Sequence, residues 1–470
     1  MKNILIISAF ILCVANSFSQ EKRLNLENKV ITPNELGIFD TDLISPSFHK
    51  ERREKLRELM PANSVAIFYS SPIRNRSNDV DYEYHQDPNF YYLTGLKEPH
   101  SVVIIYKNKI KIEGIKTNEI ILVQPRDASK ELWMGKRMGV EGVKQILNFK
   151  AVFANKDINK LKLNLKKKDK VFFISDKNDT RDTRSNSDLY DIKKLLLTEV
   201  ENTEKDNFQL NKWMAQLREI KTEEELILMR KAIYITCKAQ IELMKKLNPE
   251  MAEYQSEALV EYHFKNEGAE HAGFPSIHGS GGNSCILHYV SNRRLFEQND
   301  LLVSDIGAEY HGYTADVTRT LPVNGQYSKE QAIIYNIVLE AQTAGIESCV
   351  EGNSFWKPGQ IANEIIAKRL MELGIINNTN EVKKYFPHGT SHYLGLDVHD
   401  SGTYNELKAM QVITVEPGIY IPKGSDCDEK WWNIGVRIED DILITNMKPI
   451  NLSGCVPRTI PEIEEIMNKK

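Results

Sequence analysis

The stretch that decides the fold is residues 301–323, which read LLVSDIGAEYHGYTADVTRTLPV. Two apolar runs flank Tyr310–His311, and Gly312 relieves the backbone next to them, so the sequence predicts a β-hairpin. Asp305 and Asp316 each lie five residues from this turn, and the predicted register therefore makes them direct cross-strand partners. Opposed Cβ atoms lie about 4.5–5.5 Å apart. Two carboxylates that close repel each other unless a cation or a proton lies between them. Two solvated carboxylates at strand ends remain the alternative.

Two further carboxylates lie in apolar strand contexts. Glu416 ends the apolar run of MQVITVEPGIY and is held by Pro417, and Glu439 lies within WNIGVRIEDDILIT. Period-two alternation places Arg437 on the same face as Glu439. Buried carboxylates are rare unless they are paired or bind a metal. Each glutamate taken singly is more often a salt-bridged or solvated residue, so only the two glutamates together indicate a functional site.

The histidines gather in two segments flanked by glycines. FPHGTSHYLGLDVHD contains His388, His392 and His399, and CILHY contains His288. A buried histidine is more often a satisfied core residue than a ligand, and the zinc motif HExxH is absent from the sequence. Four carboxylates and one imidazole nevertheless form an oxygen-rich set that suits a pair of hard cations such as Mn²⁺, with Zn²⁺, Co²⁺ and Fe²⁺ as alternatives.

The order of the elements predicts two domains. Short β-branched strands alternate with helical stretches between about residues 65 and 200, which indicates an α/β domain. Thr222 and Glu225 form a capping-box signature at the start of a long helical pattern, so we place the boundary near residue 215. Beyond it the patterns predict helices and strands in alternation, an α+β arrangement of antiparallel hairpins. The predicted helices are 251–267, 328–350 and 358–373, and the predicted strands are 301–323, 411–422 and 434–445.

Composition excludes several classes of partner. The chain has 470 residues and a formal net charge of −4, which gives no electrostatic reason to expect nucleic acid or an anionic membrane as partner. Residues 1–20 have the layout of a secretory signal peptide, too short and too flanked by polar residues to span a bilayer. We therefore expect an exported protein, periplasmic or secreted. The later cysteines are widely spaced and form no CxxC pair, so a thiolate zinc site is unexpected, although one disulfide remains open.

These motifs, in this order, resemble those of the Xaa-Pro aminopeptidases (aminopeptidase P) of the pita-bread metallopeptidase family. The resemblance in the catalytic half rests on GSGGNSCILHY, SDIGAEYHGYTADVTRT, HGTSHYLGLDVHD, VEPGIY and GVRIEDDILIT. In the N-terminal half it rests on RNRSNDVDYEYHQDPNFYYLTGLKEP and PRDASKELWMGKRMG. After the signal peptide at 1–20, it implies an α/β N-terminal domain at 21–215 and a pita-bread catalytic domain at 216–470. In that catalytic domain helices cover an antiparallel sheet.

The resemblance also implies roles for single residues. Two divalent metals, with Mn²⁺ favoured, would be held by Asp305, Asp316, His392, Glu416 and Glu439. Glu416 would in addition relay a proton from the hydroxide-forming water that bridges the metals. His288, His388 and His399 would bind the substrate and stabilise the tetrahedral intermediate, with Arg437 as a support behind the ligands. The implied substrates are peptides with proline in second position, and the implied assembly is a homo-oligomer, a dimer or a tetramer.

Two other functions remain to be weighed. A prolidase, which cleaves Xaa-Pro dipeptides, shares the same metal ligands, and only the arrangement of the N-terminal motifs favours the aminopeptidase. A non-catalytic binding protein on the same fold would be expected to lose metal ligands, because a partial set of buried carboxylates is costly. None of the five is missing here.

Overall fold

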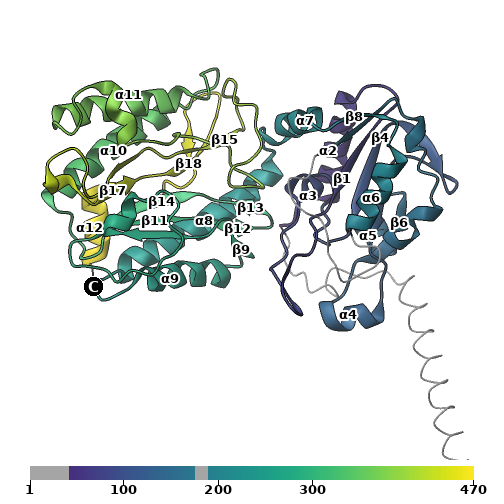
Figure 1. Cartoon of the computed structure of the whole chain (residues 1–470), viewed down its shortest axis with the longest axis horizontal. Coiled ribbons are helices and arrows are strands. Elements are labelled where there is room, and N and C mark those ends of the chain that lie inside the picture. Colours follow the sequence, from purple (N-terminus) through teal and green to yellow (C-terminus); the bar gives the residue numbers. More distant parts are fainter. Residues whose placement is uncertain (1–41, 175–188, 470) are drawn as a thin grey trace, which may run out of the picture. The chain divides into compact units, whose positions relative to one another are not determined.

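The computed structural model describes residues 42–174 and 189–469. The segment interpreted as a signal peptide, residues 1–20, lies outside the described residues. The chain divides between Leu217 and Arg218 into two compact units (Figure 1). No helix in the described ranges is long and apolar enough to cross a membrane.

The N-terminal unit is built on one mixed sheet of six strands in the order β6-β5-β4-β1-β7-β8. β1 pairs antiparallel with β4, and β4 with β5, whereas the pairs β5–β6, β1–β7 and β7–β8 are parallel. The strands are β1 (Ser64–Tyr69), β4 (Val102–Ile112), β5 (Ile115–Val123), β6 (Val152–Ala154), β7 (Lys170–Phe173) and β8 (Glu204–Asp206). The apolar runs that predicted strands in this region are the buried strands of the sheet.

Helices pack around this sheet, and a small hairpin of β2 (Asn75–Ser77) and β3 (Val80–Asp81) stands apart from it. The helices are α2 (Pro46–Leu59), α3 (Pro88–Thr94), α4 (Ala128–Met134), α5 (Gly139–Ile146), α6 (Leu189–Glu199) and α7 (Gln209–Arg218). The fully buried Arg53 of α2 pairs with Glu119 of β5 at 3.0 Å and donates to the Leu93 carbonyl oxygen at 2.7 Å. These contacts fasten α2 to the sheet and to α3.

The second unit contains short antiparallel sheets. One sheet has the order β10-β11-β14, a second β13-β12-β9, a third β15-β18-β19, and a fourth pairs β16 with β17. The strands are β9 (His271–Ala272), β10 (Ile277–Ser280), β11 (Leu301–Ile306), β12 (Ala308–Tyr310), β13 (Tyr313–Thr314), β14 (Val317–Pro322), β15 (Val412–Val415), β16 (Gly418–Ile421), β17 (Ile434–Arg437), β18 (Asp440–Leu443) and β19 (Ile450–Asn451). Backbone bonds such as Glu439 N–H to the Thr318 carbonyl oxygen, at 3.1 Å, join one sheet to the next.

Helices cover these strands on two sides. In Figure 1, α10 and α11 lie on one side of the strands, and α8 and α9 on the other. The helices are α8 (Glu223–Lys246), α9 (Glu253–Asn266), α10 (Lys329–Glu347), α11 (Lys357–Glu372) and α12 (Ile460–Asn468). The Thr222–Glu225 capping box forms at the start of α8, as the sequence predicts. The helices predicted at 251–267, 328–350 and 358–373 correspond to α9, α10 and α11.

The predicted hairpin forms, but the predicted register is wrong. The turn is centred on His311–Gly312, because Tyr310 pairs with Tyr313 and Glu309 with Thr314. Both central residues have positive φ, 51° and 87°, as a two-residue turn of type I′ requires. Asp305 therefore pairs with Thr318 and is a diagonal neighbour of Asp316, not its direct partner. The two carboxylates still share a face, since the shift is two residues and side chains alternate with period two.

Candidate metal centre

The donor side chains converge although they come from distant parts of the second unit. A ligand atom each from Asp316, His392 and Glu439 lies within 4.8 Å of the others, and all three residues are buried. The Nε2 atom of His392 lies 3.4 Å from Asp316 Oδ2, 3.6 Å from Glu416 Oε1 and 4.0 Å from Glu439 Oε1. Asp305 joins this group from β11 through its charge, since it raises the pKa of Glu439 next after burial does.

Interruptions of the strands place three of these carboxylates. Asp316 lies between β13 and β14, Glu416 between β15 and β16, and Glu439 between β17 and β18. The strands predicted at 411–422 and 434–445 are each two short strands with a carboxylate at the break, and Asp316 lies at the break in the second arm of the hairpin. Pro417 accounts for one break, because a proline cannot donate to the ladder. At a break the backbone has no partner strand on one side, so the side chain can turn into the space between the sheets.

The orientation of His392 is set by its other ring nitrogen. Its Nδ1–H donates to the Tyr393 carbonyl oxygen at 3.1 Å, which leaves Nε2 facing the carboxylates. Burial lowers the pKa of His392 to about 4, with a smaller contribution from His399. The ring is therefore neutral near pH 7 and presents a lone pair at Nε2. A neutral imidazole fixed through Nδ1 is the form in which histidine binds metals.

Burial and mutual repulsion disfavour the charged forms of the clustered carboxyl groups. Burial is the main cause that raises the pKa values of Asp316, Glu416 and Glu439, and the mutual repulsion of the carboxylates adds to it. In the described ranges the Oδ1 atoms of Asp305 and Asp316 are buried without a hydrogen-bond partner. Orphaned acceptors of this kind in a group of four carboxylates and one imidazole fit hard divalent cations. The residues therefore suit a metal-binding site.

Arg437 organises the back of this site. It donates to Asp305 Oδ2 at 2.6 Å, to the Tyr420 hydroxyl at 2.9 Å and to the Thr318 hydroxyl at 3.2 Å. Thr318 in turn donates to Glu439 Oε2 at 2.6 Å. The ion pair of Arg437 is thus made to Asp305, and the link to Glu439 runs through a threonine. This network fixes one oxygen of each of two carboxylates and leaves the others for a cation.

The three remaining histidines lie around the donors. His388 hydrogen-bonds the Tyr420 hydroxyl through Nε2 at 2.8 Å, and its Nδ1–H donates to the Gly389 carbonyl oxygen at 2.6 Å, with Glu416 Oε2 3.7 Å away. Burial, then Arg437, and to a smaller extent His288 lower the pKa of His388 to about 4. The ring of His399, an exposed residue, lies 4.1 Å from that of His392 between centroids. His288 is exposed on the segment after η4 (Gly281–Cys285).

The segment that carries His288 is fastened by one buried carboxylate, Glu253 at the start of α9. Its Oε1 accepts from Ser280 N–H and hydroxyl at 2.9 and 2.8 Å and from Asn283 Nδ2 at 3.1 Å. Its Oε2 accepts from the Tyr289 hydroxyl at 2.9 Å and from Arg294 N–H at 2.8 Å. Donors on both sides of His288 therefore meet at one fully buried group.

Sequence reasoning missed several residues of this site: Tyr420, Thr318, Asp441 and Glu253. Tyr420 and Thr318 lie in the same motifs as the donors, four residues after Glu416 and two after Asp316. Period-two alternation could have placed Thr318 on the face of Asp316. Asp441 accepts from Asp316 N–H at 3.2 Å, and Glu253 acts far along the chain, so neither has a local signal.

Comparison with known proteins gives this site a class. The family model for metallopeptidase family M24 matches residues 227–446, and that for the aminopeptidase P N-terminal domain matches 49–173. The Xaa-Pro aminopeptidase of Haemophilus influenzae is 34% identical over 89% of this chain and 96% of its own length. That of Escherichia coli is 34% identical over 90% of this chain and 98% of its own.

Solved structures agree with the sequence matches. The aminopeptidase PepP of Pseudomonas aeruginosa has a TM-score of 0.83 at 31% identity and covers 90% of this chain and 98% of its own. Aminopeptidase P from E. coli with the inhibitor Pro-Leu has a TM-score of 0.80 at 32% identity, with coverages of 90% and 98%.

The fold and the donor set together define a metal-dependent peptidase, a hydrolase whose pita-bread catalytic unit follows an N-terminal domain in the sequence. Within that class the chain belongs to the Xaa-Pro aminopeptidase (aminopeptidase P) family. The predicted fold class and family are thereby confirmed.

Proposed function

We propose that this protein removes the N-terminal residue from peptides with proline in second position, using two divalent metals. The observation that carries the proposal is the convergence of Asp305, Asp316, His392, Glu416 and Glu439 on one buried site with unsatisfied carboxylate oxygens. A single divalent cation carries two charges against the four of the carboxylates, whereas two such cations carry four. These five residues would hold the two ions, and the oxygen-rich ligand set favours Mn²⁺.

When bound, the metal pair would supply Lewis acidity and lower the pKa of a water nucleophile. The protein's own groups divide the remaining work. Glu416 is half-buried at the edge of the donor set, so it can take the proton of the attacking water and pass it on. Arg437 holds and orients Asp305 through its 2.6 Å contact.

The histidines would hold the substrate. His388 is neutral at pH 7 because burial lowers its pKa to about 4, so it acts as a hydrogen-bond donor or acceptor and not as a cation. Its contact with the Tyr420 hydroxyl fixes one ring nitrogen. His288 and His399 are exposed and can reach a bound peptide. Donors aimed at the developing oxyanion contribute more to the transition state than to the bound substrate.

The test compares three peptides with one protein preparation. Protein stripped with a chelator and reloaded with Mn²⁺ should release alanine from Ala-Pro-Ala but leave Ala-Ala-Ala intact, as read by mass spectrometry. The same protein without metal, and the variant Asp316→Ala with metal, should be inactive. Cleavage of the dipeptide Ala-Pro alone would instead make the enzyme a prolidase. Equal cleavage of Ala-Ala-Ala would refute the proline specificity, and a Mn²⁺ stoichiometry of one per chain would refute the two-metal site.

We further propose that the protein is exported, periplasmic or secreted, and works as a homo-oligomer, a dimer or a tetramer. Export is supported by residues 1–20 of the sequence. Association is supported by α4 in the N-terminal unit, where Leu132, Trp133 and Met134 are 82%, 84% and 64% exposed. Light scattering after size exclusion measures the mass, and sequencing of the mature N-terminus in a secreting host tests cleavage near residue 20.

A further inference from the structure

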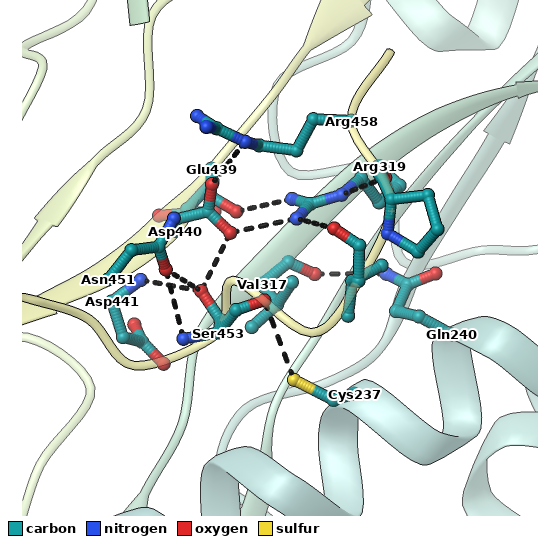
Figure 2. Close-up of polar contacts among 12 residues, drawn as sticks. Cys237, Gln240, Val317, Arg319, Glu439, Asp440, Asp441, Asn451, Ser453 and Arg458 are labelled. Carbon is teal, nitrogen blue, oxygen red and sulfur yellow. Dashed lines mark hydrogen bonds and ion pairs between the residues drawn. The ribbon is translucent and has the colours of Figure 1, made fainter. Parts of the chain in front are cut away.

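Two cysteines that the peptidase function does not use lie next to each other behind the metal site. Cys237 is a fully buried residue of α8, and its Sγ lies 3.7 Å from the Ser453 carbonyl oxygen (Figure 2). Cys455, two residues after Ser453 in the chain, is exposed. Each thiol is the largest influence on the pKa of the other, so the two side chains lie close together. They therefore join elements 218 positions apart in the sequence.

The segment that carries Cys455 braces β18, the strand that begins directly after Glu439. The Ser453 hydroxyl donates to Asp440 Oδ1 at 2.7 Å, next to Glu439 in the chain. The guanidinium of Arg319 donates to the carbonyl oxygens of Pro457 and Val456 at 2.9 and 3.0 Å. Any link between Cys455 and α8 would thus hold the segment against the back of the metal-binding strands.

The surroundings of Cys455 make its thiol more reactive than the buried thiols of this chain. The neighbouring Cys237 thiol and, to a smaller extent, the charge of Arg319 lower the pKa of Cys455 to about 7. Burial raises the pKa values of Cys285 and Cys349 to about 11 and about 12, so those thiols are inert near neutral pH. Cys455 also lines a cavity of about 340 Å³ beside Arg458, so a small reagent can reach it. The thiolate is the form that attacks a disulfide.

We propose that Cys455 and Cys237 are a redox pair that closes to a disulfide and fastens the C-terminal segment to α8. The oxidant is a disulfide donor, such as oxidised glutathione or a disulfide oxidoreductase. The Cys455 thiolate attacks one donor sulfur, forms a mixed disulfide and releases the first donor thiolate. The Cys237 sulfur, losing its proton, then attacks Cys455 Sγ and releases the second donor thiolate. Two protein thiols are oxidised by two electrons, and one donor disulfide becomes two thiols.

This inference does not depend on the proposed peptidase activity, because the reaction needs only a disulfide donor and the two protein thiols. It does agree with the proposed export, since disulfides persist in oxidising compartments. The closed loop would span more than two hundred residues, a length at which a disulfide restricts the unfolded chain strongly. An oxidised protein should therefore melt at a higher temperature than the reduced one, by about 5–10 °C.

The test equilibrates purified protein with oxidised glutathione at pH 7.5, alkylates the remaining thiols and maps the peptides without reduction. The wild type and the control Cys427→Ser should each lose two thiols and yield a peptide that joins Cys237 to Cys455. Cys455→Ser should lose none, and Cys237→Ala should stop at one glutathione per chain. Absence of the joined peptide, or an equal loss of thiols in Cys455→Ser, would overturn the pairing. A joined peptide with no change in melting temperature would overturn the fastening.

Discussion

The ion pair between Arg319 and Asp440 allows a sharp test of how the second unit is held together. Both side chains are fully buried, and Arg319 Nη2 lies 2.8 Å from Asp440 Oδ1 (Figure 2). Gln342 Nε2 donates to the other carboxylate oxygen at 2.9 Å, and the Ser453 hydroxyl donates to the first. Arg319, among other groups, holds the pKa of Asp440 below its usual value, against the effect of burial, so the residue is charged at pH 7.

The perturbation is Asp440→Asn, which keeps the shape and removes the charge. Arg319 would then be a buried cation without its counter-charge, and breaking a buried pair in this way costs about 3–5 kcal/mol. The new amide NH₂ would also face a donor, either Arg319 or Gln342, and that mismatch acts in the same direction. We therefore expect the free energy of unfolding to fall by about 3–5 kcal/mol, a large share of the 5–15 kcal/mol typical of proteins.

The assay is urea unfolding of the metal-free protein, followed by circular dichroism. The matched control is Glu340→Gln, which removes the same charge from a pair with Arg369 whose two contacts are both 3.0 Å. Those side chains are 44% and 42% exposed, so the control should lose less than about 1 kcal/mol. If Asp440→Asn is as stable as Glu340→Gln, burial does not decide the strength of this pair and the reasoning fails.

Three further predictions concern the site itself. Burial and Asp305 raise the pKa of Glu439 from 4.5 to about 8, so the folded apoprotein holds its proton more tightly than the unfolded chain. The free energy of unfolding of the chelated protein should therefore fall as pH rises from about 4.5 to about 8. Added Mn²⁺ should abolish this fall. A chelated protein that becomes more stable over the same pH range would contradict the prediction. Glu253→Gln places an amide among the donors that hold the His288 segment, so kcat/KM should drop at least about tenfold in a peptide assay, whereas unchanged kinetics would make Glu253 purely structural. A Cβ at Gly435 would overlap a backbone carbonyl oxygen, so Gly435→Ala should cost about 1–3 kcal/mol in thermal melts while Gly389→Ala, with open space, should match the wild type.

The hairpin shows what the sequence could and could not predict about the fold. Alternating apolar residues and a central glycine predicted two strands around a turn, and the structure contains them. The register was wrong because the prediction centred the turn one residue too early. His311–Gly312 is a better fit to a type I′ turn, which needs two residues with positive φ and favours glycine at the second. The signal was in the sequence, and turn chemistry would have found it.

The site shows a different limit. Motif order named the five donors, and the structure brings them together. It did not name Tyr420 or Glu253, because a tyrosine and a helix-start glutamate are ordinary residues until tertiary contacts give them partners. The breaks in the strands were also missed: each predicted strand was continuous in its apolar pattern, yet the carboxylate sits where pairing stops. The apolar pattern of a sequence indicates which residues are buried, but it does not indicate which buried polar group lacks a hydrogen-bond partner.

Residues 439–441 explain why stability and metal binding can be separated by experiment in this chain. The three carboxylates are consecutive and buried, and alternation turns the middle one away from its neighbours. Asp440 faces Arg319, which compensates its charge inside the protein. Glu439 faces His392 and the other donors, and its Oε2 accepts from the Thr318 hydroxyl. Glu439→Gln should therefore weaken metal binding while relieving repulsion in the apoprotein, the opposite of what Asp440→Asn does to stability. If both variants destabilise the apoprotein equally, the two faces of this strand are not independent.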